Sequence, residues 1–123
     1  RFAPVFEPAS VDEAYLDLTG TEAVYRGESL EATARRVRRA VVDETGFSVS
    51  IGAGTSKLVA KMAVELAKPK PGPGGAPLGD GVFVVPPGGE EAFMRRFALA
   101  DIPGVGPAFA EKLARLGLRT VDD

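Results

Sequence analysis

The chain has 123 residues, of which 45% are hydrophobic and 26% charged, a balance typical of a globular protein with one ordinary core. It contains no cysteine and no histidine, which excludes disulfides, thiolate or imidazole metal ligands and histidine-dependent catalytic triads. The remaining carboxylates, lysines, hydroxyls and backbone amides suit hard cations such as Mg²⁺. No segment approaches the roughly 18 apolar residues of a membrane span and no signal peptide opens the chain, so we predict a cytoplasmic protein with no membrane partner.

The net charge is −2, but the charges are unevenly distributed. Residues 1–34 carry two basic and seven acidic side chains, whereas residues 35–75 carry eight basic and three acidic ones. This distribution is typical of a site that holds cations against polyanionic phosphates, and equally of solvated helix faces of opposite sign. Because the chain starts at Arg1 rather than Met and stops where a new element begins, we expect it to be part of a longer protein.

The pattern of apolar residues predicts an α+β fold, with a domain boundary at Pro86 and Pro87 that separates residues 1–85 from a small helical segment at 86–123. In chain order we expect an extended hairpin at 5–18, a helix at 30–44 capped by Ser29 and ended by Gly46, a strand at 47–51, a turn at 52–54, a helix at 56–67 capped by Thr55, an irregular proline- and glycine-rich loop at 68–77, a strand at 82–85, a helix at 90–97, a turn at 103–106, and a helix at 107–116.

The first candidate site is the acidic run that contains Asp12 and Glu13. Adjacent side chains of a regular strand point to opposite faces, so these two carboxylates can share an ion only at a turn or strand end, which Pro8 favours. Mg²⁺ is usually held by carboxylates together with substrate phosphates. The alternative is a polar hairpin turn without a ligand, and Asp17 is interpreted as a structural or solvated carboxylate.

Four other features need an interpretation. Lys68 lies at a helix C-terminus, where the helix dipole favours a cation. The turn at 103–107 is either an ordinary helix–helix turn or a phosphate-binding hairpin, whose glycines let backbone amides approach an anion. Residues 52–57 (GAGTSK) lack the spacing of a P-loop, so that interpretation is rejected. Four arginines of the first helix face either DNA or solvent, and we favour solvent: Arg35, Arg36, Arg38 and Arg39.

Residues 6–19 (FEPASVDEAYLDLT) closely resemble the second catalytic motif of Y-family translesion DNA polymerases of the DNA polymerase IV type. The resemblance continues in residues 50–63 (SIGAGTSKLVAKMA), in 67–69 (AKP) and in the helix-hairpin-helix pattern of 101–117 (DIPGVGPAFAEKLARLG). It implies that residues 1–85 form the C-terminal part of a polymerase palm, an antiparallel sheet with helices on one face. Residues 86–123 would form the first part of the thumb. Ser56 stands where the family commonly has asparagine, and the loop at 69–81 is longer than expected.

The resemblance also implies roles for individual residues. Asp12 and Glu13 would help to hold two Mg²⁺ ions that activate the primer 3′-hydroxyl and neutralise the triphosphate of the incoming nucleotide. Lys68 would reach the phosphates of that nucleotide. Supporting or DNA-contacting roles would fall to Ser10, Lys57 and Lys61, and binding of the DNA backbone to Gly104, Val105, Gly106 and Lys112. The implied partners are primer–template DNA, dNTP and a sliding clamp bound through a region outside this chain.

The function implied by the resemblance is template-directed translesion DNA synthesis by a DNA-directed DNA polymerase. The chain alone is expected to be inactive, since the family's first metal-binding aspartate lies upstream of the segment that it matches. The alternative is a non-catalytic helix-hairpin-helix DNA-binding module or a polymerase-like accessory protein of the DNA damage response. A palm of the nucleotide-cyclase kind does not explain the hairpin.

Overall fold

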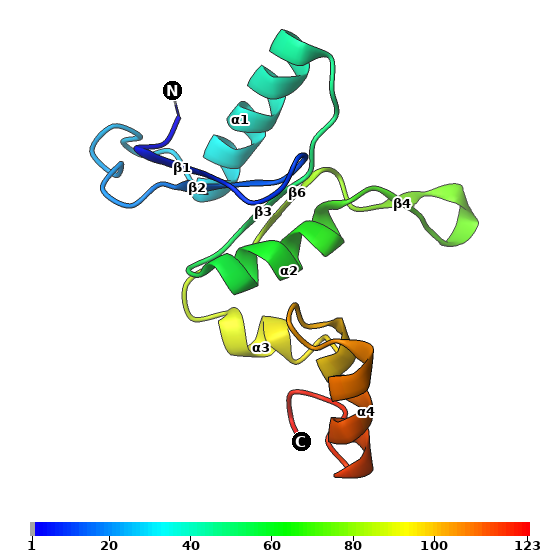
Figure 1. The fold of residues 1–123 in the computed structure, drawn as a ribbon. Coiled ribbons are helices and arrows are strands. Elements are labelled where there is room, and N and C mark those ends of the chain that lie inside the picture. The colour runs from blue at the N-terminus through cyan, green and yellow to red at the C-terminus, as the bar shows by residue number, and fades with distance from the viewer. Residues whose placement is uncertain (1) are drawn as a thin grey trace.

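A computed structural model describes residues 2–123 and shows a mixed α+β chain, in agreement with the predicted class (Figure 1). No helix within this range is long and apolar enough to cross a membrane. The elements, in chain order, are β1 (Val5–Pro8), β2 (Ala14–Asp17), α1 (Leu30–Thr45), β3 (Ile51–Ala53), α2 (Lys57–Ala67), β4 (Lys70–Pro71), the 3₁₀ turn η1 (Pro73–Gly75), β5 (Pro77–Leu78), β6 (Val82–Val84), α3 (Glu90–Met94), the 3₁₀ turn η2 (Leu99–Asp101) and α4 (Pro107–Arg115).

Strands β1 and β2 form the predicted antiparallel hairpin, in which Phe6 lies opposite Leu16. Both of these side chains are largely exposed. The two strands are joined by residues 9–13, which form a tight turn: the backbone N–H groups of Ala9 and Ser10 both donate to the carbonyl oxygen of Glu13, at 2.9 and 3.2 Å. The chain reverses direction at the acidic run, and that run is therefore a turn.

Helix α1 has the bounds that its caps predict, to within one residue. The Ser29 side chain accepts a hydrogen bond from the Ala32 N–H at 3.1 Å, and this satisfies one of the donors left free at a helix N-terminus. At the other end, the Gly46 N–H donates to the Val42 carbonyl at 2.8 Å. The buried face of the helix includes Ala34 and Val37.

Strands β3 and β6 pair in parallel, with Ile51 opposite Val82, and this corrects the prediction of an antiparallel sheet for these strands. The physical reason is the connection between them. A tight turn makes neighbouring strands antiparallel, whereas a helical crossover returns the chain to the same end of the sheet and makes them parallel. Helix α2 provides that crossover and packs closely on both strands.

Two predicted boundaries in this region are wrong by a few residues. The strand expected at 47–51 begins only at Ile51, and Gly52, which was expected in a turn, belongs to it. A Cβ on Gly52 would lie 2.2 Å from the Ala60 carbonyl oxygen, so the close contact with α2 requires glycine there. Helix α2 is capped by Ser56 rather than Thr55, since the Ser56 side chain accepts from the Val59 N–H at 3.2 Å.

Three other predictions also need correction. The segment expected to be an irregular loop contains a short antiparallel pair, β4–β5, that projects from the end of α2 (Figure 1). The helix expected at 90–97 ends at Met94, because the N–H groups of Arg96 and Phe97 donate to carbonyls three residues earlier, the tighter bonding of a 3₁₀ turn. Helix α4 ends at Arg115, one residue before the predicted end.

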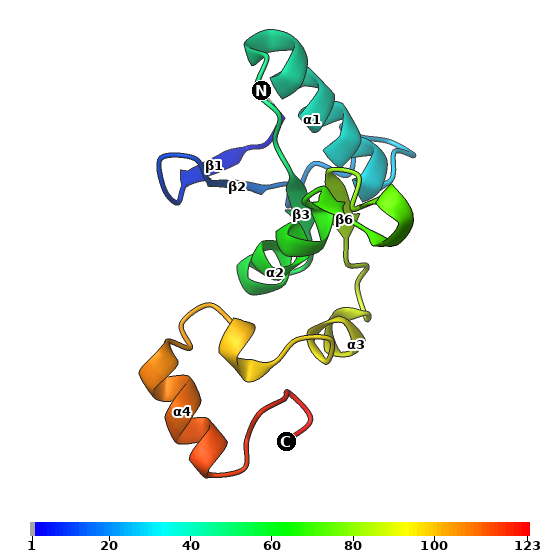
Figure 2. The same cartoon turned by 90° about the vertical axis from the view of Figure 1, so that its right-hand side faces the viewer.

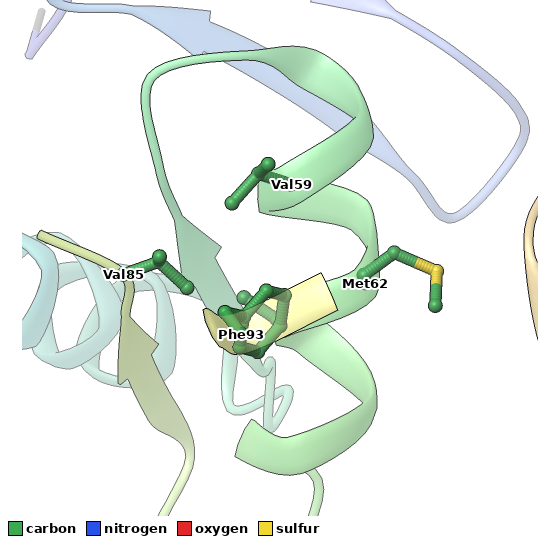
Figure 3. Close-up of a cluster of buried hydrophobic side chains, with 5 residues drawn as sticks. Val59, Met62, Val85 and Phe93 are labelled. Atoms are coloured by element: carbon green, nitrogen blue, oxygen red, sulfur yellow. The ribbon is translucent and has the colours of Figure 1, made fainter. Parts of the chain in front are cut away.

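The core lies between α2, the end of β6 and α3. Figure 3 labels four of its buried side chains, two from α2, one directly after β6 and one from α3: Val59, Met62, Val85 and Phe93. In both ribbon views, α3 and α4 lie on the side of α2 that faces away from β3 and β6 (Figure 1, Figure 2). Helix α2 is therefore the central element, in contact with the strands on one side and with the C-terminal segment on the other.

Candidate active site

Asp12 and Glu13 lie on the turn between β1 and β2, where two adjacent carboxylates can approach one ion. Asp12 is in the turn, and Glu13 directly precedes β2. Both side chains are exposed. The condition set by the sequence, that two adjacent carboxylates can approach one ion only outside a regular strand, is therefore met.

The hydroxyl of Ser10 links the two carboxylates. Its Oγ lies 2.9 Å from Asp12 Oδ1 and 3.3 Å from Glu13 Oε2. A hydroxyl has one proton to donate, so the two carboxylates share it. Because both oxygens face the same small donor, they lie on the same side of the turn.

Helix α2 presents two lysines to this hairpin. The Lys61 ammonium lies 3.4 Å from Glu13 Oε2. One turn earlier, Lys57 forms an ion pair with Glu7 at 2.5 Å, and its ammonium lies 5.5 Å from the centre of the Tyr15 ring. The helical spacing of four residues therefore gives each lysine a different carboxylate of the hairpin.

Lys68 lies at the C-terminal end of α2 and pairs with Glu65 at 2.6 Å. The hydrogen bond to Glu65 raises the pKa of Lys68 above its ordinary value. The negative charges of Glu13 and Asp12 also raise this pKa. Lys68 is therefore held as an ammonium and lies within electrostatic reach of the acidic turn.

The donor set of the turn suits part of a magnesium shell. Its carboxylate oxygens are the hard ligands that Mg²⁺ prefers, and this ion is often bound through one or two carboxylates together with substrate phosphates. Within residues 2–123, no group of three acidic, histidine or cysteine side chains is placed to hold a metal ion. Asp12 and Glu13 thus fit a site that other oxygens must complete.

The predicted glycine hairpin is present between η2 and α4. Gly104 has φ +93°, a left-handed conformation that favours glycine, whereas Gly106 has an ordinary φ of −74° and begins α4 without a side-chain cap. The Val105 N–H donates to the Ile102 carbonyl at 3.0 Å, so this amide already has a partner. Lys112 lies in the last turn of α4.

A groove of about 610 Å³ lies between this hairpin and α2. It is lined on one side by Lys61 and Glu65, and on the other by residues 101–106. Lys61 therefore contacts the acidic turn with its ammonium and also borders the groove. It lies between the acidic turn and the glycine hairpin.

The sequence interpretation missed two residues of this cluster. Glu65 is three residues before Lys68 on one helix, and this spacing is a signal from which the pair could have been found. Glu7 offered no such signal, since it lies 50 residues from Lys57.

Three of the four arginines of α1 make contacts within the chain: Arg35 with Asp80, Arg36 with Glu28, and Arg38 with the Val49 carbonyl.

Comparison with known proteins shows the family of this chain. The model of the impB/mucB/samB family matches residues 1–65, which include the hairpin, α1, β3 and most of α2. The chain belongs to this family.

The chain is similar over its whole length to curated bacterial proteins. It is 41% identical over 122 residues to a DNA polymerase IV of Halorhodospira halophila and 39% identical over 123 residues to a DNA polymerase IV of Shewanella oneidensis. These alignments cover 99% and 100% of this chain, but the chain spans only about 31% of the length of either relative.

Solved structures agree with the sequence comparison. The insertion ternary complex of Dbh DNA polymerase matches with a TM-score of 0.77 and 26% identity, over 97% of this chain and 31% of that one. DinB from Sulfolobus solfataricus matches with a TM-score of 0.74 and 26% identity, over 97% and 32%. A Y-family DNA polymerase chimera matches with a TM-score of 0.73 and 28% identity, over 99% and 32%. The resemblance to Y-family polymerases of the DNA polymerase IV type is therefore confirmed.

Proposed function

We propose that this family member is part of a translesion DNA polymerase that transfers a nucleotide from dNTP to a primer 3′-hydroxyl by two-metal catalysis. The observation that carries the proposal is the acidic turn, where Ser10 links Asp12 and Glu13. The similarity to DNA polymerase IV proteins along the whole chain supports the same reaction.

In this proposal, residues 1–85 are the C-terminal part of the palm and residues 86–123 the first part of the thumb. The helix-hairpin-helix segment follows the strand and helix elements and lies beyond α2 (Figure 2). The core nevertheless joins the two parts, since Phe93 of the proposed thumb packs with Val59 and Met62 of the proposed palm. The thumb segment would therefore be anchored on α2.

Asp12 and Glu13 would supply carboxylate oxygens to Mg²⁺. The bound ions would supply charge neutralisation of the triphosphate and activation of the primer hydroxyl. Lys68 would bind nucleotide phosphates, a role supported by its ammonium form and by its electrostatic proximity to both carboxylates. Ser10 would orient the two carboxylates before a ligand arrives.

The hairpin of residues 103–106 would bind the backbone of primer–template DNA. A Cβ on Gly104 or on Gly106 would meet no atom within 4 Å, so the surface around both glycines is open. Phosphate contacts of this kind bind DNA without reading its sequence, as an enzyme that copies any template requires.

Primer extension tests the proposal. In a complete polymerase that contains this chain, Asp12→Ala or Glu13→Ala should lower kcat by more than about 100-fold, because each removes a metal ligand. Melting should stay close to that of the wild type, since both side chains are exposed. The chain alone should not extend a primer. Unchanged kcat in either variant would favour the alternative of a non-catalytic DNA-binding or accessory protein.

A further inference from the structure

The charge of Glu13 is balanced by a residue of the chain itself. Glu13 Oε2 lies 3.3 Å from the Ser10 hydroxyl and 3.4 Å from the Lys61 ammonium. Ser10 is neutral, so Lys61 is the cation in direct contact with this carboxylate. The oxygen proposed to bind a metal ion is thus already paired with a positive charge.

The ion pair between Lys61 and Glu13 is weak and can separate easily. The Lys61 and Glu13 side chains are 42% and 53% exposed, and exposed ion pairs contribute little to stability. The lysine side chain is long and flexible, and it also borders the groove along residues 101–106. Once the Lys61 ammonium leaves Glu13, its side chain can therefore turn to this groove without movement of α2.

We propose that Lys61 is a resident counter-ion of Glu13 that gives way to the divalent cation and then turns toward the groove beside the hairpin. The inference rests on the proposed metal-binding role of Asp12 and Glu13. An ammonium and a divalent cation at one carboxylate repel each other, so the two occupy Glu13 in turn. Lys61 is in this sense a positioning residue: it sets the charge of the turn before a cation binds and borders the hairpin afterwards.

The proposal predicts that loss of the Lys61 charge strengthens metal binding, whereas loss of a residue that supports the site would weaken it. Removal of a cation that helps to build the site would weaken metal binding, whereas removal of a competing cation strengthens it. The fold-change follows from the modest strength of exposed ion pairs, and we expect Lys61→Met to tighten Mn²⁺ binding by about twofold to fivefold. Lys61→Arg keeps the charge and should bind Mn²⁺ as the wild type does.

Lys57 provides a matched control on the same helix. Lys57→Met removes the same charge one turn away, but the ammonium of Lys57 pairs with Glu7 instead of Glu13. At 0.15 M salt the Debye length is about 8 Å, so general effects of net charge are largely screened. Lys57→Met should therefore leave Mn²⁺ affinity within about 1.5-fold of the wild type.

Mn²⁺ binding to a complete polymerase that contains this chain, measured by electron paramagnetic resonance, tests the proposal and separates it from the proposed function. Wild-type binding that Asp12→Asn and Glu13→Gln do not reduce would refute the metal site itself, and the inference with it. Binding that those variants abolish, but that Lys61→Met leaves unchanged or weakens, would refute the counter-ion role alone. Tightening by Lys61→Met, with neither Lys61→Arg nor Lys57→Met doing so, is the expected result.

A second readout needs no variant of Lys61. In a Mg²⁺ titration of the wild-type complete polymerase, the NMR resonance of the Lys61 side-chain ammonium should shift with the occupancy of the site, while that of Lys57 stays in place. The reference is NaCl at matched ionic strength. A Lys61 resonance that follows ionic strength only would overturn the proposal.

Discussion

The ring of Phe93 in α3 packs against the ring of Phe83 in β6, with their centroids 5.7 Å apart. Phe93 also contacts Phe97 edge-on, at 5.1 Å. Through this ring the C-terminal segment shares one core with α2 and β6, across the sequence boundary that Pro86 and Pro87 mark. Phe93 is the buried aromatic side chain of this contact, and partly buried side chains of the same segment pack around the core: Met94, Phe97 and Ile102.

Phe93→Ala should destabilise the chain by about 3–5 kcal/mol, since it removes a large buried side chain and leaves a cavity. Phe47→Ala is the matched control, because Phe47 is 73% exposed and its loss should cost no more than about 0.5 kcal/mol. Urea unfolding followed by circular dichroism measures both. Equal effects of the two variants would contradict the assigned core.

Lys68→Ala, in a complete polymerase that contains this chain, should raise KM for dNTP more than it lowers kcat. The change removes one cation that binds phosphate in both the ground state and the transition state. A hydrogen bond to a charged group is worth about 1.5–3 kcal/mol, so kcat/KM should fall by roughly 10-fold to 150-fold. Steady-state incorporation kinetics provide the measurement.

The control for Lys68 is Lys70→Ala. The Lys70 ammonium lies 4.0 Å from Glu65, so it shares the acidic partner of Lys68 and makes a weaker pair with it. We expect a small change in KM for this variant. An equal loss in the two variants would show that general positive charge, and not the position of Lys68, binds the nucleotide.

Gly106→Val should weaken DNA binding equally on unrelated duplex sequences, because a side chain there blocks close approach of phosphates that carry no base information. Folding should be preserved, since Gly106 has φ −74° and open space around its Cα. Gly104→Val is less informative: φ there is +93°, and a left-handed conformation costs a valine about 1–2 kcal/mol.

Salt titration of DNA affinity separates the two kinds of contact at this hairpin. Lys112→Ala should lower the slope of log K against log salt by about one counterion, whereas Gly106→Val should lower affinity with little change in slope. If Gly106→Val binds DNA with wild-type affinity and has a wild-type melting temperature, the hairpin is an ordinary helix–helix turn and does not bind phosphates. A loss confined to one duplex would indicate base reading.

The Arg35–Asp80 ion pair predicts a pH dependence of stability. The hydrogen bond from Arg35 is the main cause that lowers the pKa of Asp80, and the Val82 N–H acts in the same direction. A carboxyl with a lowered folded-state pKa stabilises the fold above its unfolded pKa of about 4 and loses this contribution as pH falls through the folded value. Asp80→Asn should therefore lower Tm at pH 7, and the difference from wild type should shrink as the pH falls through the folded-state pKa of Asp80.

Thermal melting between pH 2.5 and pH 7 provides the measurement. Asp43→Asn makes the same change of net charge at an exposed position of α1 and serves as the control. A deficit of Asp80→Asn that grows toward low pH would have the wrong sign and would refute the role of this pair.

Local signals made much of the fold predictable. The cap at Ser29 and the apolar period of α1 are encoded within a few residues of the elements that they define. One error arose where two local signals were equivalent. Thr55 and Ser56 are adjacent hydroxyl residues, and the choice between them was made by Glu90, which accepts the Thr55 hydroxyl at 2.7 Å and leaves Ser56 to cap α2.

Most helices, the family resemblance and the types of residue available for chemistry could be predicted from the sequence, because these depend on local order and spacing. Which charges meet depends on the tertiary fold. Glu13 lies 48 residues from Lys61, and Glu7 lies 50 residues from Lys57. Such pairs depend on how the hairpin packs along α2, and no pattern within a short window contains that information. The parallel pairing of β3 with β6 was decided in the same way, by the crossover through α2.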